Sequence, residues 1–239
     1  MEKISADKQA GDLPTGAMFH EGMASGWSDG YSRGGFGRRR TYFLPVLDRN
    51  VIVGQRWIDL GCGSGVLTAE LLARGASVVA IDGSPNMLTE AQKNVKAASL
   101  TWLRLDVEHL VGVEDGSFDG ILCSSVIEYV QDPNALLKEA CRVLRPSGRL
   151  IISVPPTLSF VRTVQKTVRT IAASVGIERF PYLSVSKFEI APGEISCRLG
   201  ESGFVLDRMT PFDPRLPNFA LMFLRPALLI VEAYKKTSK

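Results

Sequence analysis

The stretch WIDLGCGSG, residues 57–65, decides how the rest of this chain is interpreted. An apolar run carries Asp59 two residues before the first of three glycines, Gly61, Gly63 and Gly65. Glycine lets the backbone turn sharply and approach a ligand closely, and a helix that begins there presents free N–H groups to it. The stretch therefore predicts a strand, a tight turn and a helix around a pocket for a nucleotide-like ligand.

A second acidic residue supports this interpretation. Asp82 ends the next apolar run, SVVAID, 21 residues after Gly61. A carboxylate at the end of the neighbouring strand can accept hydrogen bonds from both ribose hydroxyls of an adenosine. The two features together predict a site for an adenosine-containing ligand.

A dinucleotide is the main alternative ligand for such a site. The dinucleotide fingerprint G-x-G-x-x-G requires glycine or alanine at its sixth position, and counting from Gly61 places Val66 there. Asp59 would also repel a pyrophosphate, whereas it would attract the ammonium of an amino acid. These observations favour S-adenosylmethionine over a dinucleotide.

Strand-like apolar runs alternate with helix-like segments on both sides of the glycine turn. We expect strands at residues 56–60, 77–82, 100–106, 118–124 and 149–155, and helices at 64–74, 84–97 and 133–144. Ser84 and Asp132 are the expected helix caps, and a turn is expected at residues 145–148. This alternation predicts a parallel sheet covered by helices on both faces.

The rhythm breaks after Pro155. We expect one domain over residues 1–239, with N-terminal cap helices (1–50), a cofactor-binding core (55–155), an inserted lid (156–190) and C-terminal strands (191–239). Residues 158–175 read as an amphipathic helix inside the insertion. Such a segment can act as a pocket wall or can be a surface decoration.

Composition excludes several classes of protein. With 45% hydrophobic and 22% charged residues, 239 residues suit a single buried core, and a formal net charge of +3 gives no reason to expect a nucleic-acid partner. The four cysteines form no CxxC pair, and no secretory signal opens the chain, so we expect a cytoplasmic protein. The apolar run at 219–234 is interrupted by charges and short for a bilayer, so no integral membrane segment is expected.

Five segments resemble successive motifs of the class I S-adenosylmethionine-dependent methyltransferases, in order and at suitable spacing. They read IDLGCGSG, AIDGSPNML, LRLDVEHL, FDGILCSSVIEYV and LLKEACRVLRPSGRLIISVP. The resemblance covers about residues 55–155 and is greatest to small-molecule enzymes similar to the ubiquinone-biosynthesis O-methyltransferases. It implies an α/β, Rossmann-like three-layer sandwich with a mostly parallel seven-stranded sheet whose last strand is antiparallel.

The resemblance also implies a set of cofactor-binding residues. For the methionine part these are Asp59, Gly61, Cys62, Gly63 and Gly65, with Arg40 from the run at 38–40 for its carboxylate. Asp82 would hold the ribose, while Gly83, Ser84 and Met87 would flank the adenine and Asp106 and Val107 would contact its edge. Ser124 and Ser125 would form the floor near the sulfonium.

One position departs from the pattern of these relatives. Many of them carry a Glu-His pair after the fourth strand, and some bind a divalent metal there, but here Tyr129 follows Glu128. We therefore expect no metal at that point. The Pro-Pro dipeptide at 155–156 follows the fifth strand rather than the fourth, which disfavours a planar amine of nucleic acid or protein as the acceptor.

Residues outside the repeating core are the candidates for the acceptor pocket. They are His20, Trp27, Tyr31, Tyr129 and Tyr182, with segments 19–31 and 158–182 as expected mobile covers. The predicted activity is methyl transfer to a small-molecule acceptor, at a hydroxyl of an aromatic or lipophilic compound. An NAD(P)-dependent oxidoreductase and a non-catalytic S-adenosylmethionine-binding protein are the alternatives, and the oligomeric state is left open.

Overall fold

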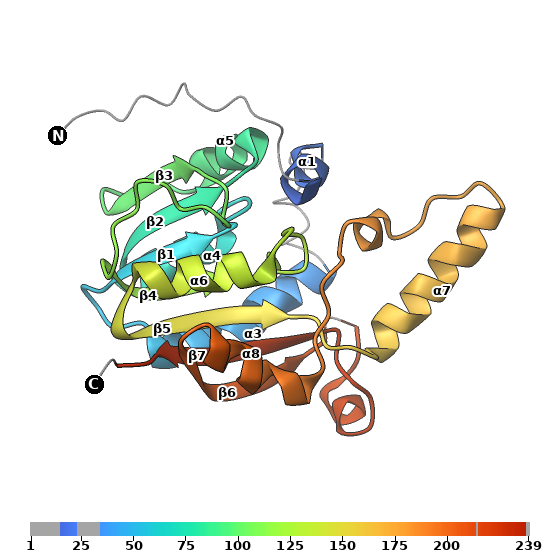
Figure 1. Ribbon diagram of the computed structural model, residues 1–239. Helices are drawn as coiled ribbons and strands as arrows, with labels where there is room; N and C mark the ends of the chain where they lie inside the picture. The colour runs from blue at the N-terminus through green and yellow to red at the C-terminus, as the bar shows by residue number, and fades with distance from the viewer. Residues whose placement is uncertain (1–14, 23–33, 214, 238–239) are drawn as a thin grey trace.

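A seven-stranded sheet forms the centre of the molecule (Figure 1). The computed structural model describes residues 15–22, 34–213 and 215–237. The strands are β1 (Arg56–Leu60), β2 (Ser77–Asp82), β3 (Leu100–Arg104), β4 (Phe118–Cys123), β5 (Leu144–Val154), β6 (Phe204–Phe212) and β7 (Leu228–Lys235), in the order β3-β2-β1-β4-β5-β7-β6. Only β7 runs antiparallel to its neighbours, β5 and β6. The predicted fold class is confirmed.

Helices cover the sheet on both faces. Helices α3 (Gly34–Asn50) and α4 (Val66–Ala73) lie behind it in Figure 1, and α6 (Pro133–Val143) and α8 (Ile195–Glu201) lie in front. Phe43 of α3 and Leu71 of α4 pack with Trp57 in one buried cluster, whereas Leu136 of α6 and Leu199 of α8 belong to another. This three-layer packing explains why the central strands are apolar on both faces.

The helix boundaries follow local backbone chemistry. Ser84 caps α5 (Pro85–Asn94) by accepting from the Met87 N–H, and Asp132 caps α6 in the same way, as predicted. Helix α4 begins after Gly65, which adopts φ 80°, a conformation that favours glycine. The turn predicted at 145–148 instead lies inside β5, where the register with β4 shifts and Ser147 adopts φ 62°.

Two segments lie at the carboxyl ends of the parallel strands. Helix α1 (Thr15–Glu21) lies above these strand ends, and α7 (Phe160–Ser174) projects away from the body, followed by the short helix η1 (Pro181–Ser184) (Figure 1). The buried side chains of α7 come from its first two turns, at Val161, Arg162 and Gln165. The short helices η2 (Pro192–Glu194) and η3 (Asn218–Met222) complete the fold.

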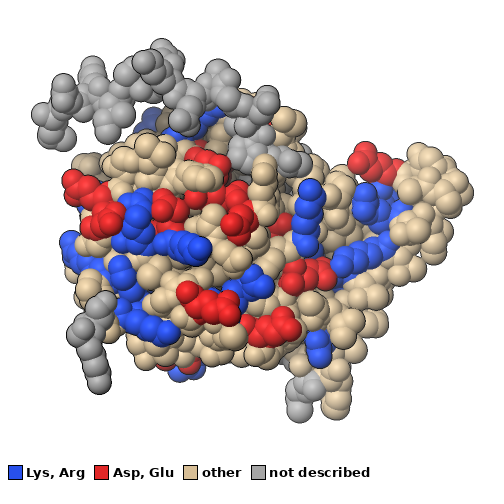
Figure 2. Space-filling view, in the orientation of Figure 1, with Lys and Arg blue, Asp and Glu red and all other residues tan. Residues whose placement is uncertain are grey.

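The surface shows mixed charge. On the face drawn in Figure 2, basic and acidic side chains are interspersed rather than gathered by sign, in keeping with the small net charge of the chain. Within the described ranges, no helix is both long and apolar enough to cross a membrane.

Candidate active site

A cavity of about 1050 Å³ opens at the carboxyl ends of β1, β2 and β4. Helix α1, the start of α3, α7 and the chain before and within η1 complete its wall. This is the place where open α/β sheets bind ligands, because strand ends and helix N-termini meet there. The cavity is large enough for a nucleoside-sized ligand and a second small molecule.

The β1 end supplies a buried carboxyl group. Asp59 is 2% exposed and accepts a hydrogen bond of 2.6 Å from the Thr68 hydroxyl. Burial raises the pKa of Asp59 to about 7, because the charged form is poorly solvated there. A cationic ligand group beside Asp59 would restore the ionised form.

The glycine turn brings the backbone against the next loop. Gly61 adopts φ 68°, and a Cβ at this position would lie 2.3 Å from Cγ2 of Val126. Gly63 also has a positive φ, of 52°, and its N–H donates to Asp82 over 2.9 Å. The turn therefore needs glycine at these positions, because a side chain would clash or would disfavour the positive φ angles.

The β2 end presents the second carboxylate. Asp82 accepts one hydrogen bond on each oxygen, from the N–H groups of Gly63 and Ser84, both at 2.9 Å. Burial raises the pKa of Asp82, although these hydrogen bonds and the charge of His20 act in the opposite direction. The remaining lone pairs can accept hydrogen bonds from a ligand.

Helix α1 is fastened over this wall at both ends. The Glu21 carboxylate accepts from the Ser84 hydroxyl and from the Asn86 N–H, the latter at 3.2 Å. At the other end Gly16 lies against Tyr129, where a Cβ would come within 2.7 Å of the Tyr129 Cβ. The helix therefore fits the cavity mouth closely on both sides.

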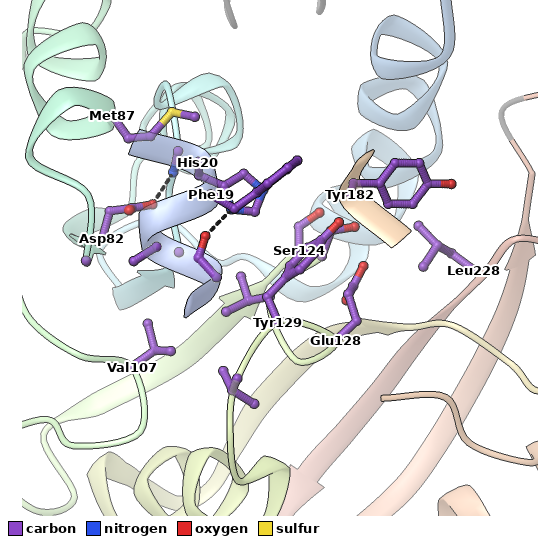
Figure 3. A pocket seen from close by; sticks show the side chains of 18 of the residues that line it. Phe19, His20, Asp82, Met87, Val107, Ser124, Glu128, Tyr129, Tyr182 and Leu228 are labelled. Atoms are coloured by element: carbon purple, nitrogen blue, oxygen red, sulfur yellow. Dashed lines mark hydrogen bonds between the residues drawn. The ribbon is translucent and has the colours of Figure 1, made fainter. Parts of the chain in front are cut away.

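His20 lies on α1 with its ring toward the cavity (Figure 3). Its Nδ1 lies 2.7 Å from the carbonyl oxygen of Gly16, and its ring meets the Tyr129 ring edge to face, with centroids 4.8 Å apart. Because a carbonyl only accepts, Nδ1 carries the proton and Nε2 carries the lone pair in the neutral ring. Burial lowers the pKa of His20, which favours that neutral form.

The loop after β4 contains several buried polar atoms. Within the described residues, Oγ of Ser124, Oγ of Ser125 and Oε2 of Glu128 make no hydrogen bond. Ser125 also adopts φ 56°, an uncommon conformation for a residue with a side chain. Burial raises the pKa of Glu128. Backbone strain and unpaired polar atoms at one loop are features of ligand-binding sites.

The structure places most sequence-predicted residues around the cavity. Lining residues among them are Asp59, Gly61, Cys62, Gly63, Asp82, Gly83, Met87, Asp106, Val107, Ser124, Ser125, His20, Tyr129 and Tyr182. Gly65 and Ser84 are not among the lining residues: Gly65 packs beside Val95 and Ala91, and Ser84 caps α5. Trp27 and Tyr31 lie outside the described residues.

From the sequence we expect Arg40 to bind the methionine carboxylate, but the structure places Arg40 elsewhere. Its guanidinium binds Glu70 of α4, and its side chain is 49% exposed, away from the cavity. The neighbouring Arg39 lines the cavity instead. Residues four apart share a helix face, so Arg39 follows the buried face of Phe43, whereas Arg40 points about 100° away from it.

The sequence also failed to identify several lining residues. They include Arg39, Arg162, Gln165, Phe180, Arg215 and Leu228. Arg162 and Gln165 share a face of the expected amphipathic helix, which was a usable signal. Arg215 and Leu228 come from the far end of the chain and carry no local signal.

Within residues 15–22, 34–213 and 215–237, no group of three or more His, Cys, Asp or Glu side chains is arranged to hold a metal ion.

Known proteins resemble this chain in sequence. A family model described as a methyltransferase domain matches residues 58–152. A ubiquinone biosynthesis O-methyltransferase of Xanthomonas oryzae pv. oryzae is 35% identical over 117 residues, which are 48% of each chain. A protein of the same name from Xanthomonas euvesicatoria pv. vesicatoria is 30% identical over 68% of this chain and 67% of its own length. The chain thus spans about half the length of the first of these relatives.

Solved structures share the fold. Magnesium protoporphyrin IX methyltransferase from Synechocystis PCC 6803, with bound SAH, has a TM-score of 0.69 at 22% identity, covering 91% of this chain and 96% of that one. An S-adenosylmethionine-dependent methyltransferase from Mesorhizobium loti has a TM-score of 0.62 at 25% identity, covering 80% and 96%.

Proposed function

Because the chain belongs to the S-adenosylmethionine-dependent methyltransferases, we propose that it transfers a methyl group from this cofactor to a hydroxyl of an aromatic or lipophilic small molecule. The observation that supports this proposal is that the two ends of the cavity have different linings. One end is lined by the glycine turn and acidic strand ends, and the other by aromatic and apolar side chains of α1 and of the insertion. The first end suits the cofactor and the second suits the acceptor.

The residues at the strand ends fit S-adenosylmethionine. Asp59 would face the ammonium, because a buried carboxylate beside a cation regains its charge. Asp82 would accept from the ribose hydroxyls with the lone pairs that Gly63 and Ser84 leave available. Arg39, in place of Arg40, would pair with the methionine carboxylate, which suits the planar guanidinium.

The adenine would lie against residues from β2 and β3. Asp106 and Val107 line the cavity beyond β3, and Met87 of α5, labelled in Figure 3, lines it as well. The Asp106 side chain accepts the Glu108 N–H at 2.9 Å, which orients its carboxylate in the loop. These residues provide an apolar slot with one acceptor for the adenine amino group.

The bound cofactor supplies a methyl group that is already activated by its sulfonium. The protein therefore has mainly to position the acceptor oxygen and to exclude water. Phe19, Tyr129 and Phe180 give the acceptor end an aromatic lining that suits a lipophilic body. Orientation by such walls, rather than an acid–base dyad, is the main requirement of the reaction.

His20 is our candidate for receiving the hydroxyl proton. Its Nδ1 donates to the Gly16 carbonyl, so in the neutral ring the lone pair is on Nε2. Burial lowers the pKa of His20, so the ring is ready to accept a proton at neutral pH. The acceptor oxygen would attack the methyl carbon as the carbon–sulfur bond breaks, and its proton would pass to His20.

Two experiments test the proposal. Calorimetric titration with S-adenosylhomocysteine and with NADH should show binding of the first ligand only, and the reverse would favour an oxidoreductase. Incubation with methyl-labelled S-adenosylmethionine and a set of lipophilic phenols should give labelled ethers that chromatography separates. Binding without transfer to any hydroxyl, amine or carbon acceptor would favour a non-catalytic cofactor-binding protein.

A further inference from the structure

The end of the cavity farthest from the glycine turn is rich in guanidinium groups. Arg162 of α7, Arg179 of the connection to η1 and Arg215 of the chain after β6 all line it. The carboxylates that line the same end are Glu128 and Glu178. An aromatic or lipophilic acceptor alone does not account for three arginines in its pocket.

Arg162 is buried and held in a fixed orientation. It is 5% exposed, its Nε donates to Glu189 Oε1 over 3.0 Å, and its Nη2 donates to the Ser186 hydroxyl over 2.6 Å. Glu189 also binds Lys166 at 2.7 Å, so one carboxylate serves two cations. The third nitrogen of Arg162, Nη1, makes no hydrogen bond within the described part of the chain.

A second guanidinium reaches the same place from another part of the fold. The Arg215 guanidinium lies over the Phe180 ring, 5.4 Å from its centroid. The Gln165 amide lies between Arg215 and Tyr182: turned so that both neighbours are satisfied, it donates to the Tyr182 hydroxyl over 2.7 Å and accepts from Arg215 Nη1 over 2.9 Å. Gln165 thus links Arg215 to the Tyr182 hydroxyl, and the charges of Arg162 and Arg215 both oppose the rise that burial causes in the pKa of Tyr182.

The positive charge of this cluster is only partly compensated. Among the described residues no ion pair joins Glu128 to Arg162, and none is formed by Arg215. Arg162 is buried and shares its one counter-charge, Glu189, with Lys166, so water screens its attraction for an anion poorly, whereas Arg215 adds a second, exposed guanidinium. The contacts of Arg162 with Glu189 and Ser186, and of Gln165 with Tyr182, are enough to hold α7 against the body. They do not require the second guanidinium of Arg215 at this place.

We propose that Arg162, Arg215 and Tyr182 form a subsite for an anionic group of the methyl acceptor, a carboxylate or a phosphate. Two guanidinium groups and a phenol are the donors that recognise such oxyanions in proteins. The inference rests on the proposed function and specifies its acceptor: an apolar body beside Phe19 and Tyr129, a hydroxyl toward His20, and an acidic group at the insertion. A neutral quinol or phenol would leave this subsite unfilled.

The test uses the full chain saturated with S-adenosylhomocysteine and three probes that share one apolar body. They are 2-naphthoate, 2-naphthyl phosphate and 2-naphthamide, titrated by calorimetry. At least one anionic probe should bind about tenfold or more tightly than the amide. The stronger of the two anionic probes identifies the group as carboxylate or phosphate.

Variants assign the preference to the subsite. Arg215→Gln removes an exposed guanidinium and should abolish most of the preference, while Tyr182→Phe should reduce it and Arg162→Lys should weaken it without leaving Glu189 unpaired. Arg225→Gln is the matched control, since the Arg225 side chain donates to the Thr157 carbonyl and does not line the cavity. It should keep the full preference.

Two results would overturn the inference: equal binding of the amide and both anions, or a preference for anions that Arg215→Gln and Arg162→Lys leave intact. Neither result touches the proposed methyl transfer, which is measured separately by cofactor binding and by labelled product. Conversely, loss of S-adenosylhomocysteine binding in the unmodified chain would refute the function before the probes are applied.

Discussion

At the scale of single residues, Asp82 carries the clearest prediction. Its two oxygens already accept from Gly63 and Ser84, and the proposed ribose contacts would use their remaining lone pairs. Asp82→Ala should weaken S-adenosylhomocysteine binding by about 1 to 3 kcal/mol, the usual cost of losing hydrogen bonds to a charged acceptor. Calorimetry measures this, with Asp115→Ala, at an exposed ion pair outside the cavity, as the control. An unchanged dissociation constant would remove Asp82 from the ribose site.

Asp59 should make cofactor binding depend on pH. Burial raises its pKa from 3.8 to about 7, so the carboxyl is mostly protonated below pH 7 in the free protein. A cationic ammonium needs the ionised form, so the dissociation constant of S-adenosylhomocysteine should rise as pH falls below about 7, by up to about tenfold per pH unit. The stability of the ligand-free protein should change in the opposite direction. Because the folded state holds the Asp59 proton more tightly than the unfolded state, the free energy of unfolding should fall as pH rises from 3.8 to about 7. Asp59→Asn should flatten both dependences, and a slope that persists in this variant would implicate another group.

His20 should control the rate rather than cofactor affinity. His20→Gln removes the proposed proton acceptor, and a positioned general base contributes about 100-fold or more to the rate. Because burial lowers the pKa of His20, the acid limb of the rate profile should lie below 6.5 and disappear in the variant. His109→Gln is the control, since that histidine is 72% exposed and does not line the cavity. Equal kcat for His20→Gln and the unmodified chain would exclude the role.

At the scale of elements, α1 and α7 should respond to different ligands. Helix α1 is fastened by Glu21 to α5 beside the cofactor end, and its Phe19 and His20 reach toward the acceptor end. Helix α7 instead packs through its first turns, beside the acceptor end. Hydrogen exchange in residues 15–22 should therefore slow when S-adenosylhomocysteine binds, and exchange in α7 should slow when 2-naphthoate is added. Glu21→Gln should speed exchange in α1 in both states. Protection of α1 that is equal with and without ligand would make it a fixed part of the core.

At the scale of the whole molecule, the protein should keep its properties under chelation. Tyr129 replaces the histidine beside Glu128, and no cluster of metal-ligating side chains exists within the described ranges. We expect the melting temperature, S-adenosylhomocysteine affinity and turnover to be unchanged in excess EDTA. A loss that magnesium or zinc restores would show that this departure does not abolish metal binding.

The sequence by itself determined the core and much of the cofactor wall. The apolar strand segments, the glycine turn and the helix caps are all encoded in short stretches of sequence. Because parallel strands align their carboxyl ends, Asp59, Asp82 and Asp106 then lie at the same edge of the sheet. Only the tertiary structure decided which arginine of the run 38–40 faces the cavity, since that depends on how α3 rotates against α4 and pairs Arg40 with Glu70. Only the tertiary structure also showed that Arg162 and Arg215 lie near each other. The two residues are 53 positions apart in the sequence, and no local pattern encodes the packing that brings them to Tyr182.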